Sequence, residues 1–186
     1  LSRNDSALSL YRRALALDPG NVYALNNIGW ISYNNHQYGE AISYFSRSIT
    51  TDPRFINAYN GLGKSYFARQ QYDSARTWYE KAFVHYQDRS FVNVYIGNFY
   101  RDLKAWDSAK VYYRMAAAID PQYEEAYNYL GQSSFALKQY DSARYYYRQA
   151  LNANPYSAYA LLNTGLVYKE LKQPDSTYAY FQQAIR

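Results

Sequence analysis

Apolar side chains recur along this chain with the spacing of one helix face. Tyr59, Leu62 and Tyr66 stand three and four positions apart, with Gly63 next to Leu62. Positions i, i+3, i+4 and i+7 lie on the same side of an α-helix, so this pattern predicts an amphipathic helix. A second apolar stretch follows after a short polar turn and predicts another helix, which opens near Tyr72. The structural unit is therefore expected to be a helical hairpin.

The hairpin pattern repeats at a constant interval. Glycines recur every 34 residues, and alanine, aromatic and small residues follow in step. Such a period is typical of a repeat architecture, in which each unit buries its apolar face against its neighbours. The matching residues are Gly29, Gly63, Gly97, Gly131 and Gly165; Ala41, Ala75, Ala109, Ala143 and then Thr177; Phe45, Tyr79, Tyr113, Tyr147 and Phe181; and Ser48, Ala82, Ala116, Ala150 and Ala184.

At these positions the chain resembles the tetratricopeptide repeat family over practically its whole length. The resemblance implies an all-α fold, a right-handed α-solenoid of antiparallel helix hairpins. It also implies that the first helix of each hairpin lines a concave side and that the second lies mostly on a convex side. In one unit the residues that carry the resemblance are Tyr127, Leu130, Gly131, Ala143, Tyr147, Ala150 and Pro155.

The repeat frame divides the chain into six parts. Residues 1–21 are expected to be the second helix of an incomplete leading repeat. Five repeats follow, at 22–55, 56–89, 90–123, 124–157 and 158–186. We expect them to form one continuous domain that belongs to a longer protein.

Two recurring features predict how each hairpin is built. The in-phase glycines are unfavourable inside a helix by up to about 1 kcal/mol, so their recurrence predicts a close approach of the partner helix. Four of the second helices open with an aspartate, at Asp73, Asp107, Asp141 and Asp175. Aspartate is a preferred N-cap residue, so this pattern favours a helix cap over a modification or recognition motif.

Composition excludes several classes of function. The chain has 186 residues, no cysteine, 26 tyrosines and a net charge of +5. Disulfides, thiolate chemistry and cysteine-based zinc sites are therefore excluded. No apolar run approaches the roughly 18 residues of a membrane-spanning helix, so we expect no membrane insertion by this segment. The first residues also lack the pattern of a signal peptide.

No residue set predicts catalysis, a metal or a cofactor. His36 and His85 fall in an inter-helix turn and at a helix end, and no His, Asp and Glu have metal-ligand spacing. The segment 61–65 ends like a phosphate-binding loop, but Ala58 stands where the earlier glycine is needed and the segment lies within a helix. Acidic residues at 124–125 suit a helix start. We therefore predict that the chain is not an enzyme.

Basic side chains raise the question of nucleic acid. A basic, aromatic surface binds single strands by stacking. Here the basic residues alternate with apolar packing positions on the second helices, which favours solvated side chains and no nucleic acid. The residues concerned are Arg12, Arg76, Lys110, Arg114, Arg144 and Arg148.

A second stripe on the first helices, which commonly binds ligand in the family, is the candidate site. Asparagines recur in it, and an amide offers both a donor and an acceptor to the backbone of an extended peptide. Aromatic residues supply apolar anchors of the kind enriched in interfaces. These residues either bind a partner or pack and hydrogen-bond within the array. The stripe also passes through Glu125 and Tyr159. The residues predicted to bind a partner are Tyr23, Asn26, Trp30, Asn57, Asn60, Lys64, Phe67, Phe91, Asn98, Arg101, Asn128, Gln132 and Phe135.

The stripe lacks one specialisation of the family. Members that grip chaperone C-termini use lysines and an arginine at set slots. Here Asn60 and Lys64 stand in the reverse order, and Phe91 and Tyr95 replace basic residues. The resemblance therefore implies no binding of such acidic tails on this face.

The sequence thus predicts a non-catalytic scaffold that binds a segment of a protein or peptide in the concave groove. The alternative is a structural spacer or assembly segment that self-associates end to end through its solenoid ends. The composition of the units resembles bacterial repeats, which favours a cell-envelope or periplasmic location over the cytoplasm.

Overall fold

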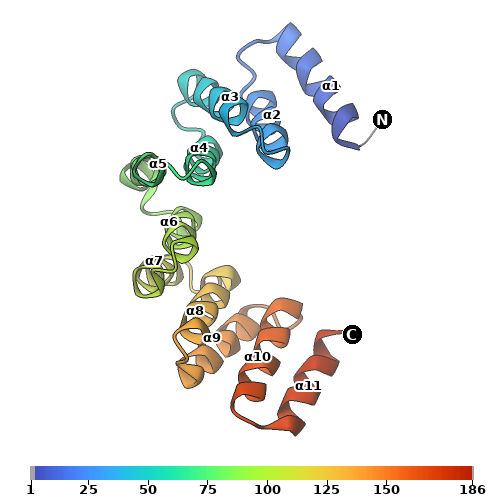
Figure 1. Cartoon of the computed structure of the whole chain (residues 1–186), viewed down its shortest axis with the longest axis vertical. Helices are drawn as coiled ribbons and strands as arrows, with labels where there is room; N and C mark the ends of the chain where they lie inside the picture. Colours follow the sequence, from blue (N-terminus) through green and yellow to red (C-terminus); the bar gives the residue numbers. More distant parts are fainter. Residues whose placement is uncertain (1–2, 186) are drawn as a thin grey trace. The chain divides into compact units, whose positions relative to one another are not determined.

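The computed structural model describes residues 3–185, and every regular element in that range is an α-helix. The prediction of an all-α array of helix hairpins is confirmed. The helices, coloured in chain order in Figure 1, are α1 (Arg3–Leu17), α2 (Val22–Asn34), α3 (Tyr38–Thr51), α4 (Ile56–Ala68), α5 (Tyr72–Tyr86), α6 (Ser90–Asp102), α7 (Trp106–Ile119), α8 (Glu124–Ala136), α9 (Tyr140–Ala153), α10 (Ala158–Glu170) and α11 (Pro174–Ala184).

The chain divides into two compact units. Unit 1 is Leu1–His85, with α1 to α5, and unit 2 is Tyr86–Arg186, with α6 to α11. The first helices of the hairpins are α2 and α4 in unit 1 and α6, α8 and α10 in unit 2. Each of the second helices α3, α7 and α9 packs against its own first helix and against the next one. Contacts therefore run between neighbours, as expected for a solenoid.

The turn inside each hairpin has the same hydrogen-bonded form. After α2, the His36 N–H donates to the Tyr33 carbonyl (2.9 Å), and the Gln37 N–H donates to the Ser32 carbonyl (2.8 Å). This is a Schellman motif, with the αL residue directly after the helix cap. The αL residues have φ of 57–61° and are His36, Gln70, Lys104, Lys138 and Lys172. None is glycine, the residue that usually occupies this αL position, so the sequence does not mark the αL residue of these turns.

The predicted aspartate caps are wrong. Asp107 is the second residue of α7, whose N-cap is Ala105, and Asp141 is the second residue of α9, whose N-cap is Gln139. Neither cap makes a side-chain hydrogen bond to the helix. The aspartates lie inside the first turn, where a negative charge complements the positive end of the helix dipole.

The close approach predicted at the recurring glycines is confirmed. A Cβ atom at Gly131 would lie 2.5 Å from Cε1 of Tyr147, a ring that is 1% exposed. Alanines of the second helices, such as Ala143 and Ala150, are fully buried. We call the contact between the two helices of one hairpin the seam. Small residues on both helices thus let each hairpin close tightly around one aromatic ring.

Over residues 3–185, no helix combines the length and the apolar character needed to cross a membrane.

Candidate functional site

The first helices of unit 1 carry seven of the candidate residues, and Trp30 is one of them. Its ring packs edge-on against Phe45 (centroids 5.2 Å apart) and Tyr33 (5.6 Å). Lys64 Nζ, from α4, lies 5.8 Å from the centre of the Trp30 ring, a cation–π distance. The structure therefore brings Trp30 and Lys64 together across two first helices.

The remaining aromatic candidates in unit 1 also contact other rings. Tyr23 packs edge-on against Phe55 at 5.3 Å but stays 69% exposed. Phe67 packs against Tyr72 at 5.1 Å and is half-buried. Tyr23 therefore keeps the larger surface for a partner, while Phe67 serves mainly the packing of α4 on α5.

The asparagines of unit 1 hold their carbonyl oxygens inward. Asn26 is 7% exposed and Asn60 is half-buried. The Oδ1 atoms of Asn26 and Asn60 are buried, and neither accepts a hydrogen bond from the part of the chain that the structure describes. An unpartnered buried acceptor costs about 1–3 kcal/mol, so each amide gains stability when a donor reaches it. Asn57, one helical turn before, is exposed.

Unit 2 fills the equivalent slots differently. Tyr113 donates its hydroxyl to Asn98 Oδ1 (2.9 Å), and Asn98 stands in the slot of Trp30. The Tyr113 ring stacks on Tyr129 (centroids 5.2 Å apart), which stands in the slot of Gly61. The side chain of Asn98 is thus hydrogen-bonded within the array, and Tyr129 contributes an aromatic ring on α8 where the equivalent position of α4 holds Gly61.

The other candidates in unit 2 are held by near neighbours. Arg101 is paired with Asp102 (Nη2–Oδ1 2.8 Å), and its guanidinium lies 5.2 Å from the centre of the Tyr129 ring. Phe91 packs edge-on against Tyr95, and Phe135 against Tyr140. Gln132 has a buried Oε1 that accepts no hydrogen bond from residues 3–185.

Glu124 joins α8 to the start of α10. Its carboxylate accepts hydrogen bonds from Asn128 Nδ2 (2.9 Å), Asn154 Nδ2 (2.7 Å) and Ser157 Oγ. Burial alone would raise the pKa of this carboxyl, but the three donors outweigh burial and lower it. Asn128 therefore turns its donor to Glu124, not to an asparagine of the neighbouring repeat, and its buried Oδ1 is left without a described donor.

A cavity of about 290 Å³ opens beside Glu124. It is lined by Glu124, Glu125, Asn128, Tyr129 and Tyr159. Glu125 is exposed and accepts a hydrogen bond from the Tyr123 hydroxyl (2.9 Å), and Tyr159 is 41% exposed. Burial, the bond to Glu125 and the charge of Glu125 all raise the pKa of Tyr123. The cavity is therefore acidic, with aromatic walls.

Of the five cavity residues, Glu125, Asn128 and Tyr159 lie in the predicted stripe, but only Asn128 was predicted to bind a partner. Glu125 was assigned to the helix dipole, and Tyr129 lies outside the predicted stripe. The available signal was that Glu125 and Tyr159 occupy the same slot of successive repeats, 34 positions apart. Neighbouring first helices bring these slots together in the fold.

One basic residue differs from its predicted environment. Lys110 was expected to be solvated, but it is 7% exposed and donates from Nζ to Gln139 Oε1 (2.7 Å). The bond joins α7 to the turn before α9, so Lys110 is a structural residue. Arg114, Arg144 and Arg148 are exposed, as expected.

The histidines lie where the sequence placed them, in the turn after α2 and in the last turn of α5. His36 Nδ1 is within hydrogen-bond distance of the Tyr38 hydroxyl (2.8 Å). Among residues 3–185, no three His, Asp or Glu side chains are grouped closely enough to hold a metal ion.

The hairpins, the repeated turns and the glycine seams define a class of protein, the α-solenoids built from helical hairpins. Family models described as tetratricopeptide repeat match residues 10–43, 33–88, 124–157 and 159–186. The chain belongs to the tetratricopeptide repeat family.

Solved structures share this fold. PilW, a widely conserved type IV pilus biogenesis factor, aligns over 97% of this chain and 84% of its own, with 21% identity and a TM-score of 0.79. The pilF protein of Pseudomonas aeruginosa aligns over 97% and 89%, with 19% identity and a TM-score of 0.70. YrrB, described as a TPR protein with an unusual peptide-binding site, aligns over 94% and 90%, with 18% identity and a TM-score of 0.61. The comparison with curated protein sequences gave no match.

Proposed function

We propose that this chain is a non-catalytic scaffold that binds a segment of a partner protein on its first helices. The observation that carries the proposal is the acidic, tyrosine-walled cavity beside Glu124. We further infer that the bound segment places a lysine or arginine side chain in that cavity. The description of YrrB as peptide-binding supports a peptide as the class of partner.

The charge of the cavity favours a basic side chain. Glu124 already accepts three hydrogen bonds, so Glu125 is the carboxylate with capacity for a new donor. Arg101, the base that contacts Tyr129, is already paired with Asp102. A cation from a partner would therefore meet Glu125 without a competing base in the cavity lining.

The walls of the cavity suit the same ligand. Tyr129 and Tyr159 line it from α8 and α10. Cations bind over aromatic faces, and this attraction reaches about 2 kcal/mol where water is excluded. Tyrosine also covers the aliphatic part of a lysine or arginine side chain with its apolar ring.

Unit 1 offers a different kind of contact. Asn26 and Asn60 each hold an acceptor without a described donor, and Tyr23 is an exposed aromatic ring. A turn of the amide group presents the oxygen to a peptide N–H, which is the donor that an extended segment carries at each residue. We propose that this face contacts the backbone of a segment and discriminates little between side chains.

Peptide display against the whole chain tests the proposal. Selected peptides should be enriched in lysine or arginine at one fixed position. Glu125→Gln should then weaken binding of the best peptide about tenfold, because a hydrogen bond to a charged group contributes about 1.5–3 kcal/mol. The dissociation constant is measured by isothermal titration calorimetry for both proteins.

Asp107→Asn is the matched control. Asp107 is an exposed acid in the first turn of α7, a second helix, and its substitution removes one negative charge without touching the cavity. If both variants weaken binding equally, general charge attraction explains the affinity. Peptides without any basic preference would overturn the cavity assignment.

The family and the similar structures support a scaffold in place of an enzyme. PilW is a type IV pilus biogenesis factor, which supports the proposal of a cell-envelope role. Fractionation of cells that produce the protein tests that location. Self-association stays a second proposal, motivated by the exposure of Leu17 (91%) and Ile185 (86%), and light scattering over a concentration series tests it.

A further inference from the structure

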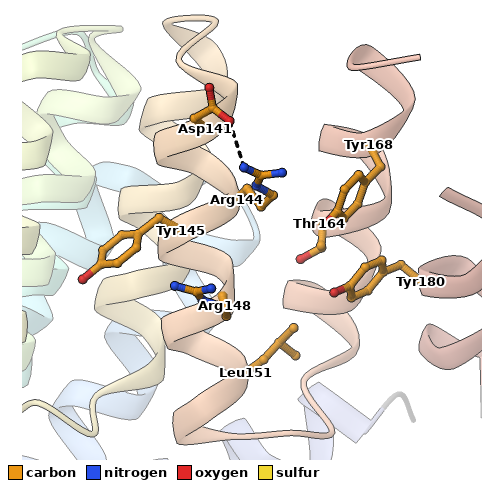
Figure 2. Close-up of a pocket in the computed structure, with 8 residues that line it drawn as sticks. All are labelled: Asp141, Arg144, Tyr145, Arg148, Leu151, Thr164, Tyr168 and Tyr180. Carbon is orange, nitrogen blue, oxygen red and sulfur yellow. Dashed lines mark hydrogen bonds and ion pairs between the residues drawn. The ribbon is translucent and has the colours of Figure 1, made fainter. Parts of the chain in front are cut away.

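A separate pocket of about 370 Å³ lies between α9, α10 and α11 in unit 2. Figure 2 shows its lining: Asp141, Arg144, Tyr145, Arg148, Leu151, Thr164, Tyr168 and Tyr180. It shares no lining residue with the cavity beside Glu124. We propose that this pocket binds a carboxylate-bearing segment of a partner protein, with an apolar side chain next to the carboxylate.

Two arginines give the pocket its charge. Arg144 and Arg148 lie one turn apart on α9; Arg144 points toward α10 and α11, whereas Arg148 lies beside Tyr145 (Figure 2). Arg144 donates to Asp141 (3.0 Å), whose side chain is 87% exposed. None of the ion pairs among the described side chains involves Arg148. The lining therefore carries one net positive charge, which matches a carboxylate better than a dianionic phosphate.

The preceding repeat shows what a purely structural cation looks like at this slot. Lys110 is the equivalent of Arg144, and it is buried and bonded to Gln139. Arg144 has 44% of its side chain exposed, and its bond to Asp141 stays on the surface of α9. Lys110 is thus used within the fold, whereas its equivalent Arg144 is accessible to a ligand.

The hydroxyl and apolar lining complete the site. The Tyr168 and Tyr180 rings stack at 5.4 Å, and the Tyr180 hydroxyl points toward α9 (Figure 2). Leu151 adds an apolar wall. Burial and Tyr168 raise the pKa of Tyr180, while the charges of Arg144 and Arg148 act against them. A carboxylate in the pocket would meet the arginines of α9 and the Tyr180 hydroxyl of α11. The apolar side chain next to the carboxylate would then pack against Leu151.

Thr164 distinguishes this repeat from the others, because it is the polar residue at a position that is apolar elsewhere. The four equivalent slots hold the buried apolar residues Ile28, Leu62, Ile96 and Leu130. Thr164 is 3% exposed and donates to the Ala160 carbonyl (2.7 Å), so its smaller side chain leaves space at the pocket wall. Thr164→Leu restores the residue type of the other repeats and should fill this space.

The test is an NMR titration of the whole, isotope-labelled chain with acetyl-Gly-Asp-Phe-Gly-amide. We expect shifts in the amides of α9, α10 and α11 around the lining residues. The peptide with asparagine in place of aspartate should bind at least about tenfold more weakly, which corresponds to loss of a charge-assisted hydrogen bond. Arg144→Gln with Arg148→Gln should abolish the shifts, and Thr164→Leu should abolish them with both arginines present.

Arg114→Gln is the matched control, because Arg114 is the exposed equivalent of Arg148 in the preceding repeat. Equal binding of the aspartate and asparagine peptides, or binding retained after both arginine substitutions, would overturn the proposal. A preference for phenyl phosphate or for oligothymidylate over the aspartate peptide would also overturn it, in favour of a phosphate ligand. Melting temperatures of all variants show that each is folded.

Discussion

Gly131 shows how little room the seam between paired helices leaves. The nearest ring atom, Cε1 of Tyr147, is 2.5 Å from the position of a Cβ, and Tyr147 is enclosed on all sides. We predict that Gly131→Ala lowers the free energy of unfolding by about 1–3 kcal/mol, the usual cost of overpacking a core. Urea denaturation followed by circular dichroism measures the change.

Gly39→Ala is the control at the residue scale. Gly39 lies in the first turn of α3, and apart from its chain neighbours and the backbone of its own helix no described heavy atom lies within 4 Å of its Cβ position. Alanine is a better helix former by up to about 1 kcal/mol, so this variant should be as stable as the wild type or more stable. A loss of similar size in both variants would contradict the assignment of the cost to the close approach at Gly131, because helix propensity alone favours alanine at both positions.

The sequence predicted the buried residues better than the polar ones. The seam glycines and alanines follow from their 34-residue period, because each slot meets the same neighbour in every repeat. The aspartates were assigned to the wrong position because the N-caps Ala105 and Gln139 lie two residues earlier, and the repeat period does not fix where a helix begins. Lys110 and Arg144 share a slot, yet only the structure shows that Gln139 binds one of them.

At the scale of elements, Glu124 connects α8 to α10 through Asn154 and Ser157. Ser157 is also the N-cap of α10 and accepts a hydrogen bond from the Ala160 N–H (3.2 Å). One carboxylate thus positions the start of the next hairpin. The five Schellman turns are a second device of this kind, and they were not predictable because none carries glycine.

Glu124 gives unit 2 a pH dependence with a definite sign. Its folded-state pKa is lowered, so its stabilisation is complete above the unfolded-state value of about 4.3 and is lost as the pH falls through the folded value. Glu124→Gln should be less stable than the wild type at about pH 6, and the difference should shrink toward about pH 3. Thermal melting over this range measures it; a constant difference would contradict the assignment.

At the scale of the whole molecule, two compact units carry different surface chemistry. The first helices of unit 1 carry Trp30, Lys64 and the side-chain amides of Asn26 and Asn60, whose oxygens are buried. Unit 2 has an acidic cavity on its first helices and a basic pocket beside α9. The repeat period predicted the fold, but it did not predict these sites, because both form where residues of neighbouring repeats depart from the shared pattern.

The central claim is that Glu125 selects a basic side chain, and a charge reversal tests it most directly. Calorimetric titrations would compare the wild type and Glu125→Lys, each with the selected basic peptide and with the same peptide carrying glutamate in place of its basic residue. We predict that the wild type prefers the basic peptide and that Glu125→Lys prefers the glutamate peptide. The same preference in both proteins, with both folded by circular dichroism, would contradict the claim.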